Sequence, residues 1–277
     1  MLRLLTYNVH RCYGTDRRLS PSRIAAVIAE LRPDVVALQE VDVGSARTDG
    51  VDQAHLLARE LGMSVQFQPV RRVRAGGWSG LAVLTRGRSR LVRAGPLPAL
   101  GMARRLVPRG ALWVAVEAGG AEVHVVNTHL SLIGRERLRQ AEALLGPGWL
   151  DHVDDREPKV LLGDLNAVPG SAAHRTLSRA LSDAQRQLAP AHRPRPTFPA
   201  PLPTLRLDHV FVSAGTVRVS AVDVPRTALT RVASDHLPLV VDVDIVPARA
   251  GTGALRRFAG PLAPALLDAG ATRGPAG

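Results

Sequence analysis

The chain has 277 residues, of which 45% are hydrophobic, so it can bury a large core and form one domain of the α/β or all-β class. Its formal net charge of +12 favours polyanionic partners such as nucleic acids, lipid headgroups or phosphorylated metabolites, although an arginine-biased composition explains the charge equally well. The 3% aromatic content, the single Cys12 and the lack of an apolar run of about 18 residues argue against a stacking platform for single strands, an internal disulfide and a membrane-spanning helix.

The chain begins with an apolar stretch, residues 2–9, that predicts a strand. A helix is predicted to follow from Ser20, because serine is a favourable N-cap and Pro21 suits the first helical position. Pro33 ends this helix. Its apolar residues recur at the spacing of helical turns, at Ile24, Val27, Ile28 and Leu31.

The run 35–38 is continuously apolar, which is typical of a strand covered on both faces, and it delivers Gln39 and Glu40 at its C-terminal end. A second helix is predicted at about 52–61, with Gly62 just after its end. Strands and two more helices follow. We expect strands at 79–85, 91–94, 111–117, 122–127, 159–162, 206–212, 217–224 and 237–245, a hairpin turn at 119–120, and helices at 135–145 and 171–181.

The last segment, residues 247–277, is rich in Ala, Gly, Arg and Pro and predicts a disordered tail. A short apolar patch at 262–267, interrupted by Pro264, is the one candidate for an appended helix. We therefore expect the functional domain at residues 1–246 and a tail at 247–277.

Hydrolysis of a phosphoester requires a metal to neutralise the phosphate, a group to activate water and fixed dipoles around the phosphorus. Magnesium favours carboxylate and amide oxygens, so Glu40 and Asn8 are candidate ligands. An ionised carboxylate directly after an apolar strand is costly unless it pairs with a cation. The alternative for Glu40 alone, a side chain that simply reaches solvent at a strand end, stays open.

The run Gly163-Asp164-Leu165-Asn166 follows an apolar strand and presents a carboxylate and an amide at alternate positions. The carboxylate of Asp164 suits the activation of water, and the amide of Asn166 suits a hydrogen bond to phosphate. An Asp/Asn turn closed by its own side chains has the same local sequence, so this alternative also stays open.

Two Asp-His dipeptides, Asp208-His209 and Asp235-His236, accompany the C-terminal strands. An aspartate that hydrogen-bonds one ring nitrogen of a histidine fixes the tautomer and stabilises the imidazolium, and Asp208 with His236 is our candidate for such a pair. We interpret five further histidines as surface or core residues, namely His10, His55, His152, His174 and His192.

Four short motifs occur in a specific order along the chain, at Thr6-Tyr7-Asn8-Val9-His10, Leu38-Gln39-Glu40-Val41, Gly163-Asp164-Leu165-Asn166 and Ser234-Asp235-His236-Leu237-Pro238. In this order, with apolar strands before the first three, they resemble the endonuclease/exonuclease/phosphatase superfamily. Weaker matches at 79–85, 109–112, 127–130 and 206–209 extend the resemblance over about residues 2–245. His209 stands where an aromatic residue such as Tyr often follows the aspartate.

The resemblance implies a four-layer αββα sandwich of the α/β class, with two mixed β-sheets packed face to face and helices outside. It implies a Mg²⁺ site, which Mn²⁺ can also fill, with the ligands Asn8, Glu40 and, in addition, Asp235. It also implies that Asp164 orients or deprotonates the attacking water and that His236, oriented by Asp208, stabilises the transition state. The remaining site residues it implies are His129 at the opposite oxygen or leaving group, and Arg109 and Asn166 at the phosphate.

The expected function is therefore metal-dependent hydrolysis of a phosphoester, by in-line attack of an activated water. A nuclease-type phosphodiesterase comes first because of the basic charge, and a phospholipid (sphingomyelinase-like) phosphodiesterase or a phosphatase is the alternative. A non-catalytic module that binds nucleic acid or a partner on the same scaffold is the alternative of a different class. We expect specificity to lie in the loops 70–79, 96–109 and 189–203, in a soluble, cytoplasmic monomer.

Overall fold

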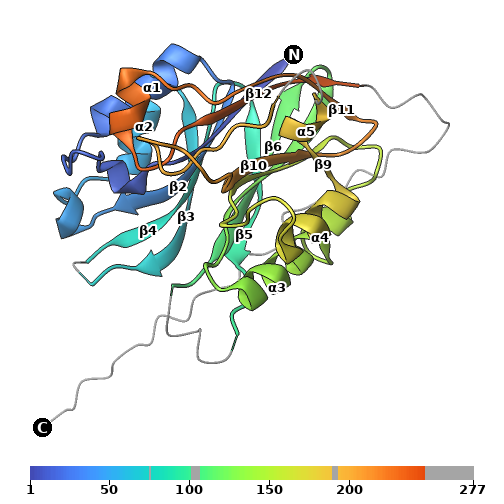
Figure 1. Cartoon of the computed structure of the whole chain (residues 1–277), viewed down its shortest axis with the longest axis horizontal. Helices are drawn as coiled ribbons and strands as arrows, with labels where there is room; N and C mark the ends of the chain where they lie inside the picture. Colours follow the sequence, from blue (N-terminus) through green and yellow to red (C-terminus); the bar gives the residue numbers. More distant parts are fainter. Residues whose placement is uncertain (75, 101–106, 189–192, 247–277) are drawn as a thin grey trace, which may run out of the picture.

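The computed structural model describes residues 1–74, 76–100, 107–188 and 193–246, and in these the strands form two six-stranded sheets that pack face to face (Figure 1). Each sheet contains one parallel pair among antiparallel pairs. The first has the order β11 (Val217–Asp223), β12 (Leu239–Ile245), β1 (Leu2–Asn8), β2 (Val35–Val43), β4 (Trp78–Thr85) and β3 (Ser64–Arg72). The second has the order β5 (Ser89–Pro96), β6 (Gly110–Ala118), β7 (Ala121–His129), β8 (Lys159–Asp164), β10 (Asp208–Val212) and β9 (Ser182–Asp183).

Helices cover the outer face of each sheet, which completes the predicted four-layer αββα sandwich. On the first sheet lie α1 (Pro21–Leu31) and α2 (Gln53–Leu61), and on the second lie α3 (Gly134–Leu145) and α4 (Ala172–Ala180). Shorter helical segments are α5 (Ala184–Gln187), α6 (Ala228–Ala233), η1 (His10–Cys12), η2 (Ala46–Thr48) and η4 (Leu150–His152). No helix in the described ranges has the length and apolarity needed to cross a bilayer.

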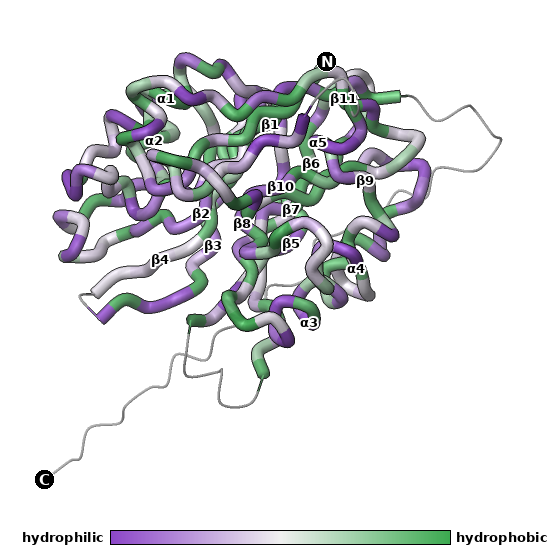
Figure 2. Tube along the Cα trace, viewed as in Figure 1, coloured by the Kyte–Doolittle hydropathy of each residue, from purple (hydrophilic) through white to green (hydrophobic). Residues whose placement is uncertain are grey.

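Three apolar clusters hold the layers together, and burial of their side chains is the main favourable term in folding. The first lies between the two sheets, the second between the first sheet and α1 and α2, and the third between the second sheet and α3 and α4. Figure 2 shows the apolar segments following the central strands, with mixed hydropathy along α3 and α4. This pattern fits strands buried on both faces and helices buried on one.

The helix ends and one hairpin follow the predicted signals. The Ser20 hydroxyl accepts a hydrogen bond from the Arg23 amide at 3.3 Å, as an N-cap should, and α1 begins at Pro21. Gly62, with φ +62°, ends α2 in the left-handed region that glycine adopts at low cost. Gly119 and Gly120 both have positive φ and join β6 to β7, as predicted.

Strand β3 was not predicted, and residues 70–72 were assigned to a loop at 70–79. Pro69 interrupts the pattern, but β3 is an edge strand, where a missing N–H leaves no central ladder bond unmade. Strand β2 also continues beyond residue 38, because its register with β4 shifts between Leu38 and Val41 in a bulge. Glu40 therefore lies inside a bulged strand, rather than at a strand end. The predicted tail at 247–277 lies outside the described residues.

Candidate active site

In the first sheet, three predicted site residues lie near one another, at one end of the neighbouring strands β12, β1 and β2. Strands β1 and β2 are parallel, so Asn8 at the end of β1 and Glu40 in the bulge of β2 lie at the same edge. Strand β12 is antiparallel to β1, so the segment just before β12, which includes His236, also reaches the Asn8 end. The hydroxyl of Ser234 fixes this segment by donating to the Asn8 carbonyl at 2.7 Å.

In the second sheet, three predicted residues are direct register neighbours. Strands β7 and β8 are parallel and pair His129 with Asp164 at their ends. Strand β10 runs antiparallel to β8, so its first residue, Asp208, pairs with Asp164 from the other side. At the end of the sheet where β7 and β8 finish, an imidazole and two carboxylates therefore lie side by side.

Asp164 lies at the centre of the site and is 2% exposed. Its Oδ2 accepts a hydrogen bond from Asn8 Nδ2 at 3.0 Å and lies 3.8 Å from His236 Nε2, and its Oδ1 accepts from the Asn166 amide at 2.9 Å. Burial raises the pKa of Asp164 to about 6, although the positive charge of His236 and the bonds from Asn166 and Asn8 oppose the shift. A carboxylate with this pKa is ionised near neutral pH and is well matched to accept a proton.

Asp208 and His236 form the predicted pair. His236 Nδ1 lies 2.8 Å from Asp208 Oδ2, and the same oxygen accepts a hydrogen bond from the Thr197 hydroxyl at 2.5 Å. Burial lowers the pKa of His236, but the charge and hydrogen bond of Asp208, together with the charges of Asp164 and Asp235, outweigh this effect and the pKa rises to about 10. His236 is therefore an imidazolium at neutral pH, with its Nε2 directed toward Asp164.

His129 and Asn166 contact each other beside Asp164. Asn166 Nδ2 donates to the Leu130 carbonyl at 3.0 Å and lies 3.1 Å from His129 Nε2, so the same amide nitrogen donates to the imidazole. Burial lowers the pKa of His129 well below its usual value, and the charges of Arg109 and His236 add to the effect. His129 is therefore a neutral imidazole, and its Nε2 also lies 3.3 Å from Asp164 Oδ2.

Glu40 and Asn8 fit an oxygen-ligated cation. The Glu40 side chain is 32% exposed, and the cation nearest to it among the described ion pairs, Arg11, lies 4.0 Å from Oε2. Asn8 Nδ2 lies 3.4 Å from Glu40 Oε1, and Asn8 Oδ1 keeps a lone pair beside the bond it accepts from the His10 amide. An accessible carboxylate and an amide oxygen are the donors that Mg²⁺ favours.

Asp235, the third predicted ligand, lies on the His10 side of the site. Its Oδ1 lies 3.3 Å from the Ser234 hydroxyl oxygen and 3.9 Å from His10 Nδ1. Its side chain is 38% exposed, and it does not line the pocket that contains Glu40. His10, interpreted from sequence as a surface or core residue, therefore borders the candidate metal site.

Asp164, Asp208 and His236 place three possible metal donors within 4.8 Å of one another. This set differs from the predicted ligands. We favour Glu40 as the main ligand because the imidazolium of His236 already lies between the two carboxylates and offsets one of their two negative charges. A further cation at this position would meet that positive charge at short range.

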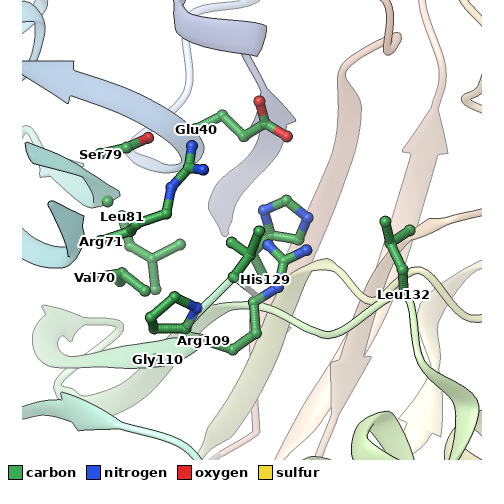
Figure 3. Close-up of a pocket in the computed structure, with 12 residues that line it drawn as sticks. Glu40, Val70, Arg71, Ser79, Leu81, Arg109, Gly110, His129 and Leu132 are labelled. Atoms are coloured by element: carbon green, nitrogen blue, oxygen red, sulfur yellow. The ribbon is translucent and has the colours of Figure 1, made fainter. Parts of the chain in front are cut away.

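Arg109 lies just before β6 and faces a pocket of about 210 Å³ between the two sheets (Figure 3). The pocket also contains Glu40 and His129, so the predicted phosphate-binding arginine lies beside the candidate metal ligand. Nε of Arg109 is buried and has no hydrogen-bond partner among the described residues. Burial lowers the pKa of Arg109, whereas Asp164 and Glu40 oppose the shift. A buried guanidinium whose Nε has no partner among the described residues is suited to bind an anion.

Three residues near the site were not predicted. Thr197 supports Asp208, as described above, and Arg71 lines the pocket with Glu40. Arg137 on α3 donates to the carbonyls of Ser131 and Leu132 at 3.1 and 3.4 Å and thereby holds the loop after β7. The arginine-rich run at 71–74 was a signal for Arg71, whereas nothing local in the sequence marks Thr197.

A second buried cluster lies behind β10 and contains His174, Asp183 and His209. Arg206 donates to both oxygens of Asp183 at 3.0 and 2.8 Å, so this carboxylate is already neutralised. His209 Nε2 lies 2.8 Å from the Ala167 carbonyl and 3.2 Å from that of Arg206, which connects β10 to the loop that carries the site. The His209 imidazole therefore fills a buried position and contacts two backbone carbonyls.

Comparisons with known proteins agree with this architecture. A sequence model of the Endonuclease/Exonuclease/phosphatase family matches residues 5–236. The uncharacterized protein YbhP of Escherichia coli K12 is 28% identical over 254 residues, which cover 88% of this chain and 96% of YbhP.

Solved structures share the fold. An endonuclease/exonuclease/phosphatase from Beutenbergia cavernae has a TM-score of 0.67 and 27% identity, over 89% of this chain and 72% of that one. A mannosyl-6-phosphatase from Bacteroides thetaiotaomicron has a TM-score of 0.65 and 20% identity, over 88% of this chain and 100% of that one. The family match over most of the chain is decisive, and the chain belongs to the Endonuclease/Exonuclease/phosphatase family of phosphoester hydrolases.

Proposed function

We propose that the chain hydrolyses phosphoesters in the presence of Mg²⁺ or Mn²⁺, by in-line attack of an activated water. The observation that carries the proposal is the position of Asp164. This buried carboxylate, with a pKa of about 6, lies between Asn8 and the His236 imidazolium. It also lies next to His129, which lines the pocket that contains Glu40. Family membership supports the same reaction class.

In the proposed reaction, Asp164 accepts a proton from water as the water oxygen bonds to phosphorus and the bond to the leaving oxygen breaks. His236, held by Asp208, stabilises the negative charge of the transition state, and Arg109 and Asn166 bind phosphate oxygens. A neutral His129 acts as a hydrogen-bonding group at the opposite oxygen rather than as an acid. Glu40, Asn8 and Asp235 would hold the metal, which when bound neutralises phosphate charge as a Lewis acid.

A nuclease-type phosphodiester is our first substrate proposal, because a net charge of +12 attracts nucleic acid. A phosphatase is the second candidate, because the pocket of about 210 Å³ favours a compact group. Pockets for larger organic ligands usually measure about 300–1,000 Å³. The mannosyl-6-phosphatase of the same fold supports this candidate by analogy.

The test is a hydrolysis assay of EDTA-treated protein before and after addition of Mg²⁺ or Mn²⁺. The panel contains plasmid DNA, abasic duplex, RNA, sphingomyelin, inositol polyphosphates and 4-nitrophenyl phosphates. We expect metal-dependent turnover of at least one substrate, lost in His236→Ala and kept in His55→Ala, whose imidazole is 69% exposed. Metal binding with no turnover across the panel would instead support a non-catalytic module.

A further inference from the structure

Arg71 and Ser79 line the Glu40 pocket but have no role in the proposed reaction. They come from neighbouring strands, β3 and β4, and are register partners, so their side chains lie on the same face of the sheet. Figure 3 shows both on one side of the pocket, with Arg109 and His129 beyond them. The pocket thus extends from the proposed phosphate position toward a second polar wall.

A bulge in β3 directs Arg71 into this pocket. The register of β3 with β4 shifts between Pro69 and Arg71, so Val70 is an extra residue. Val70 packs against the core between the sheets, and Arg71 pairs with Ser79 on the same inner face. Regular alternation after Val70 would place Arg71 on the outer face, so the bulge is what brings the guanidinium inside.

The charged lining of the pocket consists of two guanidinium groups, Arg71 and Arg109, and one carboxylate, Glu40, so its net charge is positive. None of the ion pairs formed by the described residues includes Arg71 or Arg109. The two cations are close enough that Arg71 contributes to the lowered pKa of Arg109. Two guanidinium groups that line one cavity, and form no ion pair with another described residue, repel each other, and an anion bound between them would offset this repulsion.

We propose that Arg71 and Ser79 form a subsite for a second phosphate of the substrate, next to the phosphate that is hydrolysed at Arg109 and His129. The inference rests on the proposed function, because it assigns the scissile phosphate to that site. A guanidinium binds a phosphate through two parallel hydrogen bonds, and the Ser79 hydroxyl adds a third donor. Neighbouring phosphates occur in nucleic acid strands and in bisphosphorylated small molecules, and both satisfy this chemistry.

The test measures binding by titration calorimetry in EDTA, so that no turnover occurs. Two ligand pairs differ by one phosphate: adenosine 3′,5′-bisphosphate with adenosine 5′-monophosphate, and dithymidylate with and without a 5′-phosphate. We expect the doubly phosphorylated member of at least one pair to bind about 10- to 100-fold more tightly. A preference in the nucleoside pair alone would assign a small-molecule substrate, and one in the dinucleotide pair a strand.

Arg71→Gln should abolish this preference, and Arg72→Gln is the matched control. Arg72 lies on the same strand but is exposed, with its guanidinium 5.9 Å from the centre of the Trp78 ring. Equal or undetectable binding of both members in each pair to the wild type, or equal losses in the two variants, would overturn the subsite. A preserved preference without Mg²⁺-dependent turnover of any substrate in the hydrolysis panel would contradict the proposed function alone. Near-UV circular dichroism checks that each variant is folded.

Discussion

Asn8 Nδ2, at the end of β1 in one sheet, donates a hydrogen bond to Asp164 Oδ2, at the end of β8 in the other sheet, across 3.0 Å. This bond joins the candidate metal side of the site to the carboxylate proposed to activate water. The bond also lowers the pKa of Asp164, against the larger effect of burial. The relative position of the two sheets therefore affects the pKa of the carboxylate that is proposed to activate water.

Asp208→Asn should inactivate the protein while leaving it folded. The amide cannot hold His236 as an imidazolium, so the pKa of His236 should fall from about 10 toward its ordinary value. We expect turnover to fall by about 100-fold or more, the scale of acid–base and charge effects in catalysis. NMR titration of the imidazole is a second readout, and Asp223→Asn, at an exposed ion pair, is the control. An unchanged His236 pKa in Asp208→Asn would contradict the pairing.

Glu40→Gln should weaken binding of Mg²⁺. A ligand that binds only the folded state raises the melting temperature by mass action, so Mg²⁺ should stabilise the wild type. The variant should lose most of this rise, because one ligand charge is removed. Differential scanning fluorimetry over a MgCl₂ series measures the effect, with Glu117→Gln on an exposed position of β6 as control. Equal rises in all three proteins would show that Glu40 is not a ligand.

The stability of the fold should decrease in acid through His209. Burial lowers the pKa of His209 to about 4, although Asp183 opposes the shift, while an unfolded histidine titrates near 6.5. Between these values the unfolded chain binds more protons, so the free energy of unfolding falls as the pH is lowered and is unaffected by His209 above this range.

For His209 alone we expect a decrease of roughly 2–3 kcal/mol between about pH 7 and about pH 4.5. Urea denaturation at the two pH values measures it, and His209→Phe should show a correspondingly smaller decrease. The same pH dependence in both proteins would mean that His209 is not buried in its neutral form.

Gly80→Ala should destabilise the strands beneath the pocket. A Cβ at this position would lie 2.0 Å from the Gln68 carbonyl oxygen, so β3 and β4 would have to separate. We expect a loss of about 1–3 kcal/mol in the free energy of unfolding, the usual range for overpacking. Gly87→Ala is the matched control, because no described atom lies within 4 Å of its Cβ. Equal stabilities of the two variants would refute the close approach of β3 to Gly80.

Much of the fold was predictable because the strands carry strong local signals. The run 160–162 is apolar throughout, and Ser20-Pro21 marks a helix start, so β8 and α1 were predicted close to their observed bounds. Strand β3 was not predicted, because Pro69 weakens its pattern. The proline is tolerated there because β3 lies at the edge of the sheet. A proline inside a strand pattern favours an edge strand, but the local pattern alone does not distinguish such a strand from a loop.

The candidate site was predictable to the extent that its residues belong to motifs. Asp164 and His236 do, and the structure places them 3.8 Å apart. Thr197 and Arg71 do not, because their positions depend on a loop that returns to Asp208 and on a bulge in an unpredicted strand. Such contacts arise only from the tertiary arrangement.

Asp164 is the residue proposed to activate water for hydrolysis of a phosphoester. The most direct measurement is the turnover of bis(4-nitrophenyl) phosphate and 4-nitrophenyl phosphate with Mg²⁺ by the wild type and by Asp164→Asn, with circular dichroism to confirm folding. We predict that the variant binds Mg²⁺ and stays folded but loses at least about 100-fold in turnover, as expected when a general base is removed. A folded Asp164→Asn variant that retains wild-type turnover would contradict the account.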